Sequence, residues 1–388
     1  MSPHKSLRDL TGQAGGARKS KVFVAMSGGV DSSVTAALLK EWGFSVRGVH
    51  IKMWSDPSIP CNFKEDRYDA MKVAAKLDIP FETWDLTKEY KKEVVEYMIR
   101  EYAKGRTPNP DVMCNRHIKF GIFLKKALEA GADFVAMGHY VRAVPSLYSL
   151  PLTKGTSPSV RGRKSRARPR GIKLLQGVDG NKDQSYFLWT LTQEQLKHCL
   201  FPVGEYTKPE VRAMAKKFGL PTADKKDSQG ICFIGEINIR GFLKNYIPIE
   251  RGPVLTTSGK KIGEHEGLAF YTIGQREGLG IGGGIPFYVA EKDFSKNALV
   301  VAEGPYDEKL FQKESIVTDL NWVSGNTPKL PLKCETRVRY RQPLQKCVLK
   351  SEGSKKIAEF ADSQRAVTPG QSIVFYKRGE MLGGGVID

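Results

Sequence analysis

The sequence predicts an α/β fold: a parallel sheet covered by helices, followed by a small central domain and a C-terminal β-barrel. Three observations support this prediction. Apolar strands alternate with amphipathic helices from residue 21 to about 140. Glycines and short strands dominate after about residue 226. The chain has 388 residues, which is enough for two or three domains, each with its own core.

The first domain is predicted from its alternating elements. Strands are expected over 21–26, 45–53, 81–85 and 133–138, and helices over 32–42, 65–77, 88–104 and 116–130. Within 65–77 the apolar residues recur at helical spacing. This alternation is typical of a parallel sheet with helices on both faces. Ligands on such sheets bind at the carboxyl ends of the strands.

Changes in composition suggest the domain boundaries. We expect a disordered tail over 1–20, the α/β domain over 21–226, the central domain over 227–293 and the barrel over 294–388. Residues 145–172, rich in Pro, Ser, Gly and Arg, are expected to form an exposed insertion in the first domain. Two further patterns are local. Thr207 and Glu210 have the spacing of a capping box, and the strands 287–292 and 298–302 are predicted to form a hairpin.

The chain carries a formal net charge of +19. Seven basic residues and no acidic residue lie between Lys154 and Arg170. Such an excess suits a polyanionic partner, although basic charge also aids solubility. No apolar run approaches the roughly 20 residues that span a bilayer, and no export signal precedes the first strand. We therefore expect a cytoplasmic protein without a membrane partner.

The segment SGGVDSS, residues 27–33, lies between the first strand and the first helix. Its two glycines allow backbone N–H groups to approach a phosphate closely, and Ser32 and Ser33 open a helix whose N-terminus attracts anions. Asp31 is unusual beside phosphates unless a cation bridges them, which implies Mg²⁺. The lysine of Walker-type loops is missing. An ordinary strand–turn–helix connection is the alternative.

Two of the six cysteines stand in unusual surroundings. Cys114 follows the proline-rich run Thr107-Pro-Asn-Pro-Asp111, and a helix is expected close behind it. A thiol near a helix N-terminus, followed by Arg116 and His117, is expected to have a lowered pKa. Asp111 is a candidate general acid or base. The second, Cys232, follows a Gln-Gly turn at a domain junction.

A third pattern lies in the barrel, where residues 334–341 alternate strictly. This places Glu335, Arg337, Arg339 and Arg341 on one face of a strand. Three arginines on an exposed face suit a phosphate backbone, and a merely solvated face is the alternative.

Taken together, these motifs resemble the tRNA-specific 2-thiouridylase family within the PP-loop ATP pyrophosphatases. The resemblance extends from about residue 21 to 388 and rests on the motifs AMSGGVDSS, TPNPDVMCNRHIKF, MGHY, GNKDQSYFLW, DSQGICFIG, YTIGQREGLG, RVRYRQ and PGQSIVFY. It implies that ATP, with Mg²⁺, adenylates the C2 oxygen of the wobble uridine of a tRNA. Sulfur from a persulfide then replaces this oxygen, giving 2-thiouridine, AMP and pyrophosphate.

The resemblance also implies roles for cysteines and partners. Cys232 would carry a persulfide supplied by a cysteine desulfurase or a sulfur-relay protein. Cys114 would attack this persulfide and form a transient disulfide with Cys232, and Asp111 would be the acid or base. The partner nucleic acid would be the anticodon stem-loop of tRNA.

The same resemblance implies three sets of binding residues. The ATP site would comprise Ala25, Met26, Ser27, Gly28, Gly29, Val30, Asp31, Ser32, Ile51 and Gly138. The target base would meet Asn109, Pro110 and Asp111. The remaining tRNA contacts would be His139, Lys182, Asp183, Gln184, Tyr340, Arg341 and Gln371. No dedicated metal ligands are implied beyond a possible Mg²⁺ contact of Asp31.

Simpler interpretations exist for several of these residues. His139 fits a satisfied histidine at a strand end, and residues 182–184 fit a plain helix cap. Two other functions are also compatible with parts of the sequence: a PP-loop synthetase of the amidotransferase type acting on a small molecule, and an RNA-binding module without catalysis. The excess positive charge argues against the first, and intact Asp31, Asp111, Cys114 and Cys232 argue against the second. Nucleotide-dependent pyrophosphate release with tRNA would separate the three.

Overall fold

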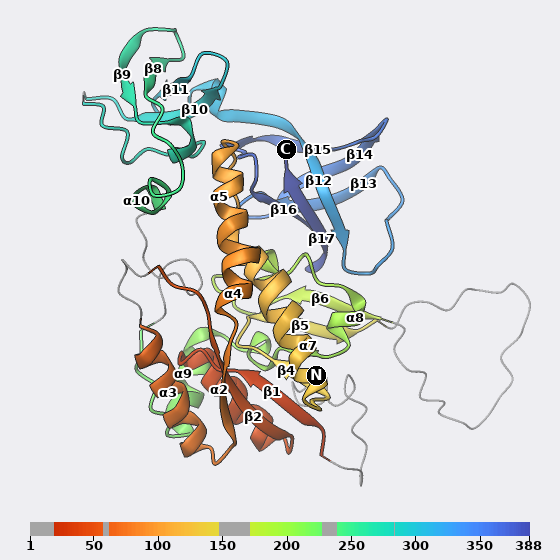
Figure 1. Ribbon diagram of the computed structural model, residues 1–388. Coiled ribbons are helices and arrows are strands. Elements are labelled where there is room, and N and C mark those ends of the chain that lie inside the picture. The colour runs from red at the N-terminus through yellow and green to blue at the C-terminus, as the bar shows by residue number, and fades with distance from the viewer. Residues whose placement is uncertain (1–18, 57–61, 147–170, 227–238, 283) are drawn as a thin grey trace, which may run out of the picture.

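The computed structural model describes residues 19–56, 62–146, 171–226, 239–282 and 284–388 (Figure 1). Most of the expected tail, the central part of the basic insertion and Cys232 lie outside these residues. The chain forms a sheet domain, a central domain and a C-terminal barrel, in the predicted order. Within the described ranges, no helix combines the length and apolar character needed to span a membrane.

A five-stranded parallel sheet with the order β3-β2-β1-β4-β7 forms the base of the first domain. Its strands are β1 (Lys21–Ala25), β2 (Ser45–Lys52), β3 (Phe81–Asp85), β4 (Phe134–Ala136) and the short, unpredicted β7 (Cys199–Leu200). The parallel arrangement confirms the prediction from alternation. It also brings the carboxyl ends of β1, β2 and β4 to one edge of the sheet.

Helices cover both faces of this sheet. Successive side chains of β1 point to opposite faces, and each set packs against a different group of helices. Val22 and Val24 pack in one core with helices α2 (Val30–Glu41), α3 (Phe63–Lys76) and α9 (Lys208–Lys217). Phe23 packs in the other core with α4 (Thr87–Tyr90), α5 (Glu96–Ala103) and α7 (Leu124–Glu129). Figure 1 shows these two groups of helices around β1 and β2.

Two of the predicted helices contain π-helical turns. Lys91–Val95 lies between α4 and α5, and Cys114–Phe123 lies between α6 (Pro110–Met113) and α7. The helical segment that was predicted over 116–130 therefore begins at Pro110, six residues before its predicted start. A π-helical turn brings carbonyl and amide groups five residues apart together. At Gly121 a Cβ would lie only 2.9 Å from the Arg116 oxygen, so glycine suits this position.

A hairpin links the first domain to the barrel. Its strands β5 (Val141–Pro145) and β6 (Ile172–Gln176) are antiparallel, and β6 also pairs with β17 of the barrel. At its tip the Ser146 N–H donates to the Gly171 carbonyl at 2.8 Å. Ser146 and Gly171, which flank the undescribed part of the basic insertion, are thus neighbours in the fold.

The central domain contains α10 (Ile239–Leu243) and a four-stranded sheet of order β10-β11-β8-β9. These strands are β8 (Gly252–Thr256), β9 (Lys261–His265), β10 (Phe287–Asp293) and β11 (Ala298–Glu303). The predicted hairpin of β10 and β11 is confirmed. A boundary after residue 293 would divide this hairpin, whose second strand also pairs with β8. The sheet itself continues to Glu303.

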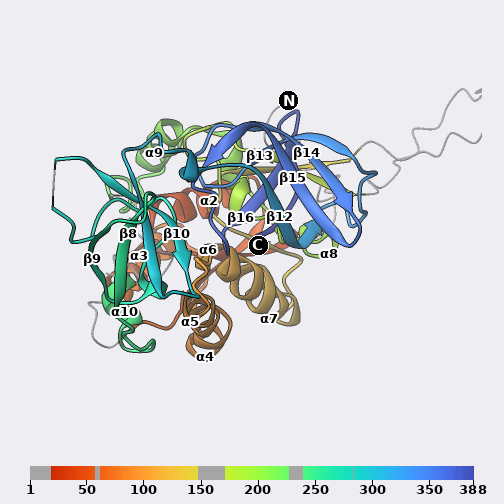
Figure 2. The ribbon, with the colours of Figure 1, turned by 90° about the horizontal axis from the view of Figure 1, so that it is seen from above.

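The last six strands form a closed barrel, because β12 pairs with β17 as well as with β15. They are β12 (Phe311–Trp322), β13 (Leu332–Arg337), β14 (Gln345–Glu352), β15 (Lys355–Arg365), β16 (Ser372–Lys377) and β17 (Glu380–Ile387). Viewed from above, the central domain and the barrel lie side by side, with α6 near the middle (Figure 2).

Candidate active site

The loop after β1 has the backbone geometry of an anion-binding turn. Gly28 has φ +80°, and a Cβ there would collide with the Asp66 carbonyl oxygen. Gly29 is the N-cap of α2, so no side chain at that position caps the first-turn N–H groups. Ser32 and Ser33 turn their hydroxyls back to the Gly29 carbonyl, at 3.1 and 2.8 Å. The N–H groups of the first turn are therefore suited to hold phosphate.

The remaining residues of the expected nucleotide site surround this loop. Ala25 ends β1, and Val30 is the first residue of α2. Met26 is buried and its N–H donates to the Val49 carbonyl at 2.8 Å. Ile51 lies in β2 and is buried in the same core as Cys114. Met26 packs in the other core, with α2, so the two side chains are buried in different cores and neither is exposed at the loop.

Gly138 follows β4 and packs directly on the start of α2. A Cβ at this position would lie 2.8 Å from the Ser32 nitrogen and 3.0 Å from the Asp31 Cβ. Only a residue without a side chain allows β4 and α2 to approach this closely. The end of β4 therefore adjoins the anion-binding loop, as the parallel topology requires.

Asp31 receives two hydrogen bonds on one oxygen. The Tyr140 hydroxyl and the Lys208 ammonium group each donate to Asp31 Oδ1 at 2.7 Å. The Lys208 side chain is 10% exposed and that of Asp31 is 32% exposed. The loop sequence lacks a lysine, but a buried lysine from α9 lies beside it in space.

The proline-rich segment begins a helix earlier than predicted. Asn109 is the N-cap of α6, and its Oδ1 accepts a hydrogen bond from the Val112 N–H at 3.2 Å. Pro110 occupies the first helical position, where its missing N–H has no consequence. An Asn-Pro pair is a recognisable start signal, which the sequence interpretation overlooked. Asp111 is half-buried in the first turn, and Cys114 is the first residue of the π-helical stretch.

Cys114 is fully buried, with 0% exposure. It lies inside a helix rather than at its N-terminus, so the expected activation by the helix end loses its geometric basis. Burial, together with nearby Arg116, lowers the pKa of His117. His117 is therefore less able to act as a cation beside a thiolate.

All three domains meet at the segment that leads into α6. In the barrel, the Pro369 carbonyl accepts from the Thr107 N–H at 2.8 Å, and Gln371 Nε2 donates to the Pro108 carbonyl at 3.1 Å. From the central domain, Thr272 Oγ1 lies 3.2 Å from Thr107 Oγ1. The approach to Asn109 and Asp111 is thus held from two sides.

Family models match the three structural parts of the chain. The description "tRNA methyl transferase HUP domain" matches residues 20–236, and "tRNA methyl transferase PRC-barrel domain" matches 240–303. The model described as "Aminomethyltransferase beta-barrel domain" matches 312–387. These ranges correspond to the sheet domain, the central domain and the barrel.

Curated proteins match the chain over nearly its whole length. The tRNA-specific 2-thiouridylases MnmA of two Streptococcus thermophilus strains, CNRZ 1066 and LMD-9, are each 46% identical to it over 377 residues, which is 95% of this chain and of theirs. This chain belongs to the tRNA-specific 2-thiouridylase family. Among solved structures, the U34-tRNA thiolase NcsA from Methanococcus maripaludis with its [4Fe-4S] cluster is 16% identical, covering 63% of this chain and 69% of its own, at a TM-score of 0.36.

The positions that the family resemblance assigned to tRNA divide into buried and accessible groups. His139 is buried between Phe120 and Phe201, and burial lowers its pKa well below the usual value. Asp183 is 1% exposed. The Gln184 side-chain oxygen accepts from the Tyr140 N–H at 3.0 Å. His139 and Asp183 are therefore buried in the fold, whereas Gln184 is partly exposed and contributes a hydrogen bond to the backbone of Tyr140.

The accessible group consists of two residues that follow β13, Tyr340 and Arg341, and of Lys182 and Gln371 elsewhere in the chain. Tyr340 and Lys182 are partly exposed, and Arg341 is exposed with its guanidinium 5.1 Å from the Tyr340 ring centre. Gln371 is only partly buried, but its amide also donates to the Thr107 carbonyl at 2.9 Å. Exposed atoms of these positions are thus open to contact with another molecule.

The predicted arginine face in the barrel is wrong. Strand β13 ends at Arg337, so the alternation does not continue to 341. Arg337 is buried against Asp183, with Nη1 2.8 Å from Oδ2. Arg339 donates to the carbonyl oxygens of Ile273 and Ala366, at 3.1 and 2.9 Å. Two of the three arginines therefore join domains, and only Arg341 of the three is exposed.

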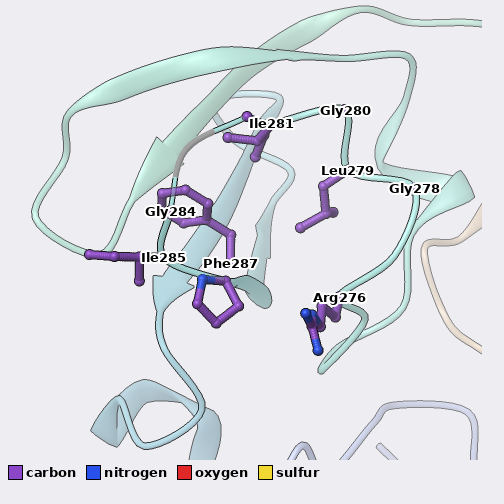
Figure 3. Close-up of a pocket in the computed structure, with 10 residues that line it drawn as sticks. Arg276, Gly278, Leu279, Gly280, Ile281, Gly284, Ile285 and Phe287 are labelled. Atoms are coloured by element: carbon purple, nitrogen blue, oxygen red, sulfur yellow. The ribbon is translucent and has the colours of Figure 1, made fainter.

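A pocket of about 460 Å³ lies in the central domain, away from the anion-binding loop (Figure 3). Its lining residues are Arg276, Gly278, Leu279, Gly280, Ile281, Gly282, Gly284, Ile285, Pro286 and Phe287. Arg276 is the charged side chain among them, and none of these residues is acidic or nucleophilic. The described part of the lining thus supplies one cationic side chain and otherwise apolar residues and glycines.

Tyr140 and Lys208 were not among the predicted site residues. The sequence places Lys208 at the first position of α9, where the helix dipole disfavours a cation. A lysine in this unfavourable position was the sequence feature that could have indicated an ion pair with another part of the chain. Cys232, by contrast, was predicted and lies outside the described residues, so its position relative to Cys114 stays a prediction.

Proposed function

We propose that this protein is a tRNA-uridine 2-sulfurtransferase that converts the wobble uridine of tRNA to 2-thiouridine. The observation that carries the proposal is its 46% identity to tRNA-specific 2-thiouridylases over 95% of the chain. The geometry at the edge of the sheet supports it, because the anion-binding loop adjoins the end of β4. The net charge of +19 suits a tRNA substrate.

ATP and Mg²⁺ are the proposed cofactors of the first step. The cradle made by Gly28, Gly29 and Gly138 has no room for side chains, and the first-turn N–H groups of α2 point toward the place a phosphate would take. Asp31 is the residue that would hold Mg²⁺, because it is a partly exposed carboxylate beside these N–H groups. The bound ion would neutralise phosphate charge when pyrophosphate leaves.

The target base would meet the segment that begins α6. Asn109 and Pro110 are held rigidly by the N-cap hydrogen bond and by the contacts of Thr107 and Pro108 with the barrel. Asp111 lies one residue further, partly exposed, and is the proposed proton donor or acceptor. A wobble base must leave the stacked anticodon loop to reach such a segment.

The proposed sulfur transfer uses two cysteines. A persulfide on Cys232, supplied by a cysteine desulfurase or a relay protein, would be attacked by the Cys114 thiolate. The S–S bond of the persulfide breaks, the terminal sulfur leaves as hydrosulfide with the electron pair, and a Cys114–Cys232 disulfide forms. Hydrosulfide then forms a C–S bond at C2 while the C–O bond breaks and AMP leaves with the oxygen. A dithiol reductant restores both thiols.

Mass spectrometry of tRNA nucleosides tests the proposal. The protein is incubated with unmodified tRNA, ATP, Mg²⁺ and a persulfide source. We expect 2-thiouridine, with AMP and pyrophosphate formed in equal amounts. Cys114→Ser and Cys232→Ser are each expected to abolish thiolation while tRNA binding persists.

The matched control is Cys199→Ser. Cys199 is also buried, its Sγ lies 3.1 Å from the Gln195 carbonyl, and burial raises its thiol pKa. This variant is expected to remain active. Normal thiouridine formation by Cys114→Ser, or formation without ATP, would refute the mechanism.

A further inference from the structure

Lys208 is a buried cation whose position local structure does not explain. It is 8% exposed, and it occupies the first turn of α9, where positive charge is unfavourable. The capping of α9 is supplied by Thr207, whose N–H and hydroxyl contact Glu210 at 2.7 and 2.8 Å. Burying an ammonium group is destabilising unless it is paired. The ion pair with Asp31 supplies such a partner for the ammonium group.

The contact restrains one oxygen of the carboxylate. Lys208 Nζ and the Tyr140 hydroxyl converge on Asp31 Oδ1, each at 2.7 Å. The ammonium group also lies 5.9 Å from the centre of the Tyr140 ring. Among the residues that the structure describes, no hydrogen-bond donor contacts the other oxygen, Oδ2. Asp31 is thus held at one oxygen and leaves the second for another partner.

Three distant parts of the chain build this arrangement. Asp31 comes from the second position of α2, Tyr140 follows β4, and Lys208 begins α9. Asp179 adds a further tie, because its Oδ2 accepts from the Lys208 N–H at 2.9 Å. Groups that orient a metal-binding carboxylate through its second oxygen typically change metal affinity 10- to 100-fold when removed.

We propose that Lys208 is a positioning residue: together with Tyr140 it fixes Asp31 so that Oδ2 faces the Mg²⁺ that accompanies ATP. The inference rests on the proposed function, because it assumes that magnesium–ATP binds at the loop of residues 27–33. Lys208 acts through Asp31, so it affects the metal-bearing part of the nucleotide more than the adenosine part.

Equilibrium binding tests this role without turnover. The probes are an ATP analogue with a methylene bridge between the α- and β-phosphates, titrated at several Mg²⁺ concentrations, and AMP. For Lys208→Met we expect the Mg²⁺ concentration that gives half-maximal analogue binding to rise at least about tenfold. AMP affinity is expected to change less than about twofold. Lys208→Arg, which keeps the charge, is expected to restore part of the Mg²⁺ response.

Lys216→Met is the matched control, because Lys216 lies on the same helix with an exposed ammonium group 3.2 Å from Asp224. It is expected to leave the Mg²⁺ response unchanged. Tyr140→Phe removes only a hydroxyl and tests the inference even if Lys208→Met does not fold. An unchanged Mg²⁺ response in Lys208→Met, or in Tyr140→Phe where Lys208→Met does not fold, would overturn the inference, and so would an equal loss of AMP and analogue affinity. Failure of the unaltered protein to bind the analogue would instead refute the proposed nucleotide site.

Discussion

Replacing Arg337 by methionine is expected to destabilise the junction between the barrel and the sheet domain. The side chains of Arg337 and Asp183 are 10% and 0% exposed. Removing one partner of a buried ion pair typically destabilises a protein by about 3–5 kcal/mol, because the other charge stays buried. Asp183 keeps hydrogen bonds from the N–H groups of Gly177 and Ser185 and from Gln176 Nε2. We therefore expect the lower end, about 3 kcal/mol.

Urea unfolding followed by circular dichroism measures this effect. With a slope of about 3 kcal/mol per molar urea, the midpoint is expected to fall by about 1 M. Arg341→Met is the control, since exposed substitutions usually change stability by less than about 0.5 kcal/mol. The double variant Arg337→Met with Asp183→Asn is expected to recover part of the loss. If Arg337→Met and Arg341→Met unfold at the same urea concentration, the buried pair does not stabilise this junction.

Three further predictions follow from the same structure. Gly138→Ala is expected to raise the ATP concentration for half-maximal pyrophosphate release about tenfold, because the new Cβ would lie 2.8 Å from the Ser32 nitrogen. The control is Gly180→Ala, whose Cβ would meet nothing within 4 Å. The same half-maximal ATP concentration in both variants would contradict the close approach of Gly138 to α2. Burial lowers the pKa of Lys292 from 10.5 to about 8, so the unfolding free energy should rise with pH between these values, and Lys292→Met should flatten this rise in pH-dependent denaturation. An unchanged slope would refute that pKa shift. Replacing residues 147–170 by Asn-Gly removes seven basic residues and should weaken tRNA binding without stopping thiolation. If the salt dependence of the tRNA Kd is unaltered, these seven basic residues do not contact tRNA.

Local patterns predicted the elements whose determinants lie within a few residues. The strands of the first domain follow from apolar runs, and the helix of α9 follows from the capping box of Thr207 and Glu210. The arginine face failed because β13 ends at Arg337, where the chain turns to bury that side chain against Asp183. The alternation of residue types does not reveal where a strand ends when that end depends on a contact with another domain.

The candidate site shows the same division. The loop of residues 27–33 is predictable because glycine and serine spacing determine its shape. The pairing of Asp31 with Lys208 joins residues 177 positions apart, and only the packing of α9 against α2 brings them together. The burial of Cys114 was equally hidden, since it depends on packing against residues from distant parts of the sequence.

Residues 105–108 bear on how the enzyme responds to a bound nucleic acid. Lys292 of the central domain donates to the Gly105 carbonyl at 2.9 Å, and the Arg106 guanidinium reaches Asp388 at the C-terminus at 2.8 Å. These four residues lead directly into α6, so both the central domain and the barrel are anchored to the segment that positions Asp111 and Cys114. A rearrangement of either domain relative to the sheet would therefore displace the start of that helix.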